Sequence, residues 1–372
     1  MIVNLCPQEL VRAAEPGSDS NPGSTGWPSG RGRDITTWLD FARIVAVFAV
    51  VMLHISAGYV DGEPLGSSSW WAGNFYDSAT RWCVPMLVMV SGALLLAPDR
   101  SRHLGSFYRR RMARIGLPLI FWTLVYLAWT WWKRIGAGFE VAPGDLALLA
   151  ASGLPYYHLW FLYMLLGLYL FAPFLQRLVA GCNQRQFLLL VVLAFFVAAI
   201  AQAHSRLSER ELAVFTSWFL RFIPFFLLGY YVRLYARSRR YLWPLVLVGA
   251  GIAGTCTGFW LFGKYGFRPG ALYLYSYLSV TVIAMSVGAV YLFRWSSLAS
   301  RIPPRFMVLG SRLSFGIFLV HPLVMESIPL LDARVQGTAA WIAIPLSAIM
   351  VIVISAVVSF LLGVIPGLRR VA

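Results

Sequence analysis

The sequence has little charge for its length. Charged side chains make up 12% of the 372 residues and apolar ones 59%, and the mean hydropathy is +0.69. A soluble domain of this size carries about twice that share of charge. The composition therefore argues against a soluble globular protein and predicts a chain that crosses a membrane several times.

Cysteine is scarce as well, and no secretory signal is present. The four cysteines form no Cys-x-x-Cys pair, so the sequence supports neither a zinc site nor a disulfide framework, and we expect no metal. A signal peptide needs a stretch of roughly 7–15 apolar residues, and none precedes Trp38. Residues 1–37 are rich in Gly, Ser and Pro and are predicted to be a disordered cytoplasmic tail.

Ten apolar segments follow this tail. The alternation typical of a membrane β-barrel is missing, and only helices or closed barrels satisfy the backbone in lipid, so we predict an all-α polytopic membrane protein with about ten transmembrane helices. The segments are 38–60, 79–97, 115–133, 158–176, 187–204, 213–232, 242–262, 272–293, 308–330 and 340–366. They form a single membrane domain over residues 38–368.

The distribution of Lys and Arg predicts how this domain is oriented. If the N-terminus is cytoplasmic, more than half of the 31 Lys and Arg fall in inner loops. This inner excess predicts that both termini are cytoplasmic. The same bias accounts for the net charge of +16 without a nucleic-acid partner.

The first apolar segment, from Trp38 to Tyr59, carries Asp40, Arg43 and His54. Ionisable groups within a span are costly and indicate function. Arg43 and His54 are eleven residues apart, which is about three helical turns with only ~20° left over and roughly 16 Å along the axis. Both side chains should therefore project from one face, and they predict a tunnel with a cation near its inner mouth and an imidazole deep inside. Histidine is suited to general-base catalysis near neutral pH.

The inner loop before the third segment contains the run RRRMAR. Arg111 and Arg114 are three residues apart, so a helix would present them on one face. Arginines so placed can bind phosphates in a bidentate manner, and they predict a phosphate-rich cytoplasmic ligand. The six arginines of this loop are also ordinary for the inner side of a membrane protein.

Three further runs contain candidates that the sequence leaves open. Ser91, next to Gly92, is interpreted as either a helix-packing residue or a direct participant. Arg81 is either an interfacial anchor or an acceptor contact. At the outer edge of the fourth segment, Trp160 is best explained as part of the interfacial aromatic belt, although it suits stacking on a sugar, and the role of His158 stays open.

The last candidates lie in SFGIFLVHPLVME and in the sixth segment. His321 precedes Pro322, which disturbs helix geometry, and Glu326 follows near the outer end. Arg221 requires a counter-charge, and Asp40 and Glu326 are the intramembrane acids considered for it. The sequence does not pair them.

Together these features resemble the acyltransferase-3 family of integral membrane acyltransferases, and within it the bacterial enzymes that O-acetylate surface polysaccharides. The similarity runs from Trp38 to the last span. Four features carry it: the spacing of Arg43 and His54, the Arg111-x-x-Arg114 pair, the successive runs VPMLVMVSGALLL and HLWFLYMLLGLYL, and SFGIFLVHPLV near the end.

The resemblance implies an acyl-CoA donor, usually acetyl-CoA, bound from the cytoplasm. It implies an acceptor hydroxyl on a surface polysaccharide or exopolysaccharide, or on a lipid-linked repeat unit, at the outer side of a bacterial inner membrane. By this similarity His54 is the general base or acyl relay, Arg43 belongs to the donor tunnel, and Arg111 and Arg114 bind CoA phosphates or hold their loop. Many relatives carry an extra periplasmic domain that this chain lacks, so it is expected to act alone.

The mechanism we expect is proton removal by His54 as the sugar hydroxyl attacks the thioester. Ser91 or a backbone amide would stabilise the oxyanion, and an acetyl-histidine intermediate stays open. Aromatic residues at the outer edge are expected to bind the sugar: Trp70, Trp71, Tyr156, Tyr157 and Trp160.

Two other classes compete with this interpretation. A transporter or exporter of polysaccharide intermediates would also have ten spans and buried charges, but it commonly shows inverted repeats. The Arg43–His54 span has no counterpart in the second half of the sequence. A sensor or scaffold would not need the two residues aligned.

Overall fold

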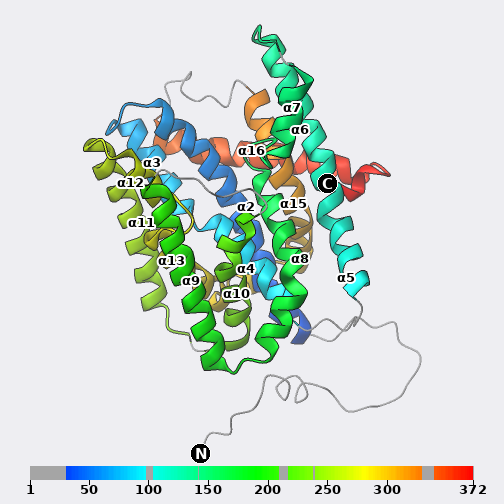
Figure 1. Cartoon of the computed structure of the whole chain (residues 1–372), viewed down its shortest axis with the longest axis vertical. Helices are drawn as coiled ribbons and strands as arrows, with labels where there is room; N and C mark the ends of the chain where they lie inside the picture. The colour runs from blue at the N-terminus through cyan, green and yellow to red at the C-terminus, as the bar shows by residue number, and fades with distance from the viewer. Residues whose placement is uncertain are drawn as a thin grey trace, which may run out of the picture.

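The computed structural model describes residues 31–97, 104–140, 142–208, 217–237, 239–328 and 339–371. All regular structure in these residues is helical (Figure 1). The helices are α2 (Arg31–Gly62), α3 (Ser68–Thr80), α4 (Cys83–Leu95), α5 (Leu104–Arg111), η1 (Met112–Gly116), α6 (Leu117–Gly136), α7 (Pro143–Ala151), α8 (Trp160–Ala180), α9 (Gln184–Leu207), α10 (Trp218–Tyr235), α11 (Leu242–Lys264), α12 (Arg268–Leu274), α13 (Val280–Trp295), α14 (Leu298–Arg301), α15 (Pro304–Ser327), α16 (Ala340–Val364) and η5 (Leu368–Arg370).

Each of the ten predicted segments contains a helix, which confirms the all-α polytopic membrane fold. Among the described residues, eight helical stretches are long and apolar enough to cross a membrane. The two predicted spans outside this set are α10, with 18 residues, and α13, with 16. At 1.5 Å per residue, both are shorter than a hydrocarbon core of about 30 Å.

Helix boundaries differ from the prediction at three places. α2 begins at Arg31, inside the predicted tail, and residues 1–30 of that tail lie outside the described residues. The predicted outer loop at 61–78 contains the helix α3, and α5 precedes the predicted third span. In each case polar side chains lie on a helix, and hydropathy alone assigned them to loops.

α2 lies at the centre of the domain and packs against α3, α4, α15 and α16. Small buried residues on α2, Ala42, Ala46 and Ala49, allow these neighbours to approach. The α2–α15 pair is the scaffold on which the candidate site is built.

α4 and α10 form a second close pair, through glycine. A Cβ added to Gly92 would lie 1.8 Å from the carbonyl oxygen of Phe226, and one added to Gly229 would lie 1.9 Å from that of Met89. The two backbones are therefore in direct contact. This explains the small residue after Ser91 as a helix-packing device.

Candidate functional site

Arg43 and His54 of α2 both face α15. Arg43 donates from Nη1 to Ser311 Oγ at 3.1 Å, and the His54 ring stacks on His321 at a centroid distance of 5.4 Å. Ser311 and His321 are ten residues apart on α15, nearly the same spacing as on α2. The predicted shared face is thus confirmed, and α2 and α15 run in the same direction along it.

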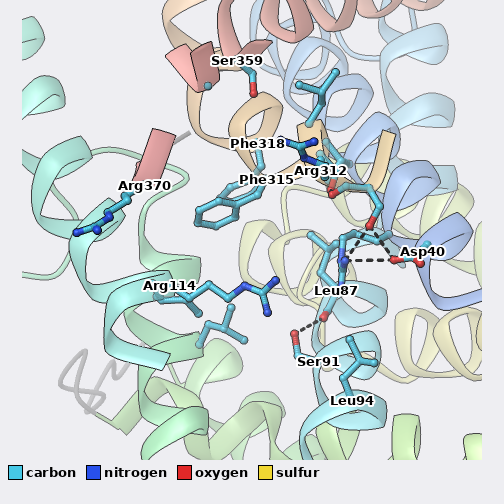
Figure 2. A pocket seen from close by; sticks show the side chains of 18 of the residues that line it. Asp40, Leu87, Ser91, Leu94, Arg114, Arg312, Phe315, Phe318, Ser359 and Arg370 are labelled. Carbon is cyan, nitrogen blue, oxygen red and sulfur yellow. Dashed lines mark hydrogen bonds and ion pairs between the residues drawn. The ribbon is translucent and has the colours of Figure 1, made fainter. Parts of the chain in front are cut away.

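A cavity of about 1050 Å³ opens beside the Arg43 end of this pair (Figure 2). Its described lining holds seven arginines and a single carboxylate, that of Asp40. The arginines come from five elements and are Arg43, Arg110, Arg111, Arg114, Arg312, Arg369 and Arg370. Such a lining is suited to a polyanion.

Arg43 is fixed by a small polar network. Its Nη1 lies 3.5 Å from Asp40 Oδ1, and the Ser311 hydroxyl donates to the same oxygen at 2.7 Å. The Arg43 side chain is 30% exposed. Asp40 and Ser311 therefore orient the guanidinium at the cavity wall and leave part of it accessible to a ligand.

Arg111 and Arg114 both line the cavity, as their spacing predicted. The helix between them widens into the π-helical turn Met112–Gly116. Pro118 has no N–H to donate to the carbonyl of Arg114, so the α-helical hydrogen-bond ladder is interrupted here. Arg111 lies over the Phe107 ring, and Arg114 extends into the cavity (Figure 2).

Three of the five histidines meet at the other end of the α2–α15 pair. His54 stacks on His321, and the His158 ring lies 5.4 Å from His321. The described residues contain no group of His, Cys, Asp and Glu placed to hold a metal ion. The sequence singled out these three histidines separately and did not predict that they form one cluster.

The hydrogen bonds of His321 determine which ring nitrogen carries its proton. Nδ1 lies 2.8 Å from the carbonyl oxygen of Phe318 and 3.2 Å from that of Ile317. A carbonyl only accepts, so Nδ1 must donate and carry the hydrogen. Nε2 of the neutral ring is then a lone-pair acceptor, and it is buried without a hydrogen-bond partner among the described residues.

Phe318 connects the cavity to the histidine cluster. It lines the apolar end of the cavity with Val47 and Phe161, and its ring centroid lies 5.5 Å from that of His158. His158 is 2% exposed and lies against His321, so this imidazole is buried between the cavity and the pair formed by His54 and His321. A chain reaching past Phe318 would enter a dry environment of imidazoles and aromatic rings.

The cluster borders on polar groups at its far side. Glu326 accepts from Lys133 Nζ at 2.6 Å, from Trp129 Nε1 at 3.1 Å, and from the hydroxyl of Tyr156. The Tyr157 ring lies 4.9 Å from His54, yet Tyr157 is 42% exposed. His54 itself is half-buried, so this side of the cluster is partly accessible.

Two predicted arginines have structural partners. Arg81 pairs with the buried Asp77 and donates to the Tyr275 carbonyl at 2.9 Å, so it belongs to a buried polar cluster. Arg221 donates to Gln202 Oε1 at 3.3 Å. The acids considered for Arg221 bond elsewhere, because Asp40 pairs with Arg43 and Glu326 with Lys133.

Other predicted contacts lie away from the histidines. Ser91 lines the cavity, but its hydroxyl donates to the Leu87 carbonyl of its own helix at 2.9 Å. Trp160 stacks on Tyr277 and packs against Phe222, and Trp70 is 2% exposed, so both are packed against other aromatic rings.

Sequence reasoning missed two groups of residues. Arg312, Arg369 and Arg370 line the cavity, although the sequence assigned them only to positive inner loops. Asn74 and Asp77 precede Arg81 by seven and four residues, a helical spacing that would have revealed a polar face on α3.

The arginine-lined cavity and the histidine cluster thus lie at opposite ends of the α2–α15 pair, with Phe318 between them, and none of the three histidines is among the described lining residues of the cavity. The sequence profile of an acyltransferase domain, acyltransferase 3, matches residues 36–364. The chain belongs to the acyltransferase-3 family. Comparisons with curated proteins and with solved structures give no match.

Membership of the family makes this protein an acyl-transferring enzyme of the membrane, with an acyl donor and an acceptor. The matched region runs from within α2 to the end of α16 and hence includes Arg43, the histidine cluster and most of the cavity. Two cavity arginines, Arg369 and Arg370, follow it.

Proposed function

We propose that this enzyme transfers an acetyl group from cytoplasmic acetyl-CoA to a sugar hydroxyl of a surface polysaccharide or exopolysaccharide, or of its lipid-linked repeat unit. The observation that carries the proposal is the arginine-lined cavity whose apolar end adjoins the histidine cluster at Phe318. CoA has the same two-part chemistry, with phosphates at one end and an uncharged arm bearing the thioester at the other.

Different residues of the cavity bind different parts of the donor. Arg111 and Arg114, with Arg43 and Arg312, bind phosphates at the cavity wall. The uncharged arm lies along Val47, Phe161 and Phe318 and directs the thioester toward His54. With both termini in the cytoplasm, as the Lys and Arg bias predicts, the cavity opens to the cytoplasm of a bacterial inner membrane.

His54 acts as general base in this mechanism. It takes the proton of the acceptor hydroxyl as the oxygen attacks the thioester carbonyl. A C–O ester bond forms and the C–S bond breaks, and the proton on His54 passes to the departing thiolate. The acceptor approaches from the exposed side of Tyr157, and Ser91 helps to line the donor cavity.

His321 supports this step. Its ring stacks on that of His54, its Nδ1–H is held by two carbonyls, and its Nε2 has no hydrogen-bond partner among the described residues. The neutral His321 ring stacked on His54 stabilises the imidazolium that forms there during the reaction. His158 packs behind the pair.

The test is proton NMR of the host's surface polysaccharide. A deletion strain is complemented with wild type, with His54→Ala and with His204→Ala, a control at the exposed end of α9, after checking that each protein reaches the membrane. We expect acetyl signals with wild type and His204→Ala and none with His54→Ala. Full restoration by His54→Ala would contradict the role of His54, and unchanged acetylation in all strains would contradict the acceptor class.

A further inference from the structure

The last described residues return to the membrane domain after α16 has ended. α16 ends at Val364, and Gly367 has φ +96°, a left-handed conformation that glycine adopts without strain. This turn directs the short helix η5, Leu368–Arg370, back toward α6. In Figure 1 the C-terminal end lies beside α6.

A buried hydrogen bond holds this segment. The indole Nε1 of Trp122 on α6 donates to the carbonyl of Val371 at 2.8 Å, and the two residues are 3% and 4% exposed. Val371 N also donates to the Leu368 carbonyl at 2.9 Å. The segment is therefore anchored at the cavity, and its two arginines have defined positions.

Arg369 and Arg370 line the arginine-rich cavity while remaining exposed. They also line a second cavity of about 460 Å³, together with Leu117 and Gly367. Because they line the cavity and are also exposed, they lie where the cavity opens to its surroundings.

We propose that Arg369 and Arg370 form the binding subsite for the 3′-phosphate of the CoA donor; this inference rests on the proposed function. The acyl group must reach the histidine cluster beyond Phe318, and the 3′-phosphate lies at the opposite, nucleotide end of CoA. The end farthest from the thioester belongs at the mouth, where these two arginines are. Charge-assisted Arg–phosphate contacts provide the recognition.

The subsite gives the enzyme a way to distinguish donors. CoA thioesters carry the 3′-phosphate, whereas 3′-dephospho-CoA and carrier-protein-bound pantetheine thioesters do not. The structure therefore assigns donor selectivity to a C-terminal segment that follows the matched acyltransferase domain.

The experiment is calorimetric titration of the purified full chain in lipid nanodiscs with CoA and with 3′-dephospho-CoA. For wild type we expect about tenfold tighter binding of CoA, equal to 1.4 kcal/mol. In Arg369→Ala/Arg370→Ala the affinity for CoA should fall to that for 3′-dephospho-CoA, whose own affinity should not change. Trp122→Phe, which removes the indole N–H and keeps a ring, should lose part of the preference.

The matched control is Arg239→Ala/Arg240→Ala, which removes the same charge from an exposed loop outside the cavity. It should retain the full preference. If the Arg369→Ala/Arg370→Ala protein also retains it, the subsite is wrong while the donor cavity stands. If wild type and control bind neither compound, the donor assignment fails and the subsite fails with it.

Discussion

Polar side chains have different surroundings at the two ends of the α2–α15 pair. At the Arg43 end, the guanidinium is oriented by Asp40 and Ser311 and remains partly accessible in a cavity lined by arginines. At the His54 end, imidazoles pack on one another and on aromatic rings, and His321 Nε2 has no partner among the described residues. Under the proposed function, the Arg43 end binds the charged donor and the His54 end moves the proton.

This difference can be tested by kinetics, because a loss of donor binding raises KM whereas a loss in the chemical step lowers kcat. A residue at the cavity end should act mainly on the donor KM. A residue at the histidine end should act mainly on kcat.

The largest expected effect is that of His54→Ala. Removing a general base lowers the rate by about 10²–10⁴-fold. We expect this loss in kcat, with the donor KM within a factor of about two of wild type. Acetyl transfer from radiolabelled acetyl-CoA in membrane vesicles measures both, with His204→Ala as control. A rise in KM at unchanged kcat would place His54 in the binding site instead.

His321→Asn tests the second imidazole more finely. The Asn amide keeps an N–H for the carbonyls of Ile317 and Phe318 but provides no acceptor at the Nε2 position. We expect kcat to fall by about 10²-fold, at the low end of the range for proton-transfer groups. His321→Gln, which places its amide near the Nε2 position, should retain more activity. Equal losses in the two variants would indicate a packing role.

The packing of α4 on α10 positions the cavity wall and can be tested without catalysis. In Gly92→Ala the new methyl group meets the Phe226 carbonyl, so overpacking should destabilise the fold by about 1–3 kcal/mol. Thermal unfolding in detergent measures it. Gly249→Ala on α11, where a Cβ meets nothing within 4 Å, is the matched control. Equal melting temperatures for the two variants would contradict the close contact of α4 and α10.

The smallest effect in this series is expected at Arg43. Arg43→Ala removes one of several phosphate-binding cations, so the donor KM should rise by about tenfold while kcat changes little. The donor KM of Arg43→Lys should lie between those of wild type and Arg43→Ala, because an ammonium keeps the charge but cannot form the bidentate contact. If Arg43→Ala lowers kcat as strongly as His54→Ala does, the two ends are not functionally separate.

The sequence predicted much of this arrangement because helical periodicity is a local property. The spacing of Arg43 and His54, and that of Arg111 and Arg114, defined their faces without knowledge of any neighbour. The Ser91-Gly92 pair likewise favoured close helix packing, although the sequence did not identify α10 as the partner. Family resemblance supplied the expected chemistry, and the acyltransferase profile supports it at family level.

What the sequence could not predict depends on long-range contacts. The histidine cluster joins α2, α15 and the turn before α8, and no local pattern links these segments. Arg369 enters the cavity because Gly367 turns the chain back and Trp122 holds its end. The polar residues of α3 were assigned to a loop because polar side chains lower the mean hydropathy of the segment. Their burial in a cluster with Tyr275 is a long-range contact that the sequence does not reveal.

The most direct test of the account is a cryo-electron microscopy structure of the full chain in nanodiscs with CoA. The account predicts phosphate density against Arg111 and Arg114 and the thiol next to Phe318, directed toward His54. CoA bound outside the cavity, or bound in it with the thiol directed away from Phe318, would contradict the central claim that the cavity delivers the thioester to the histidine cluster.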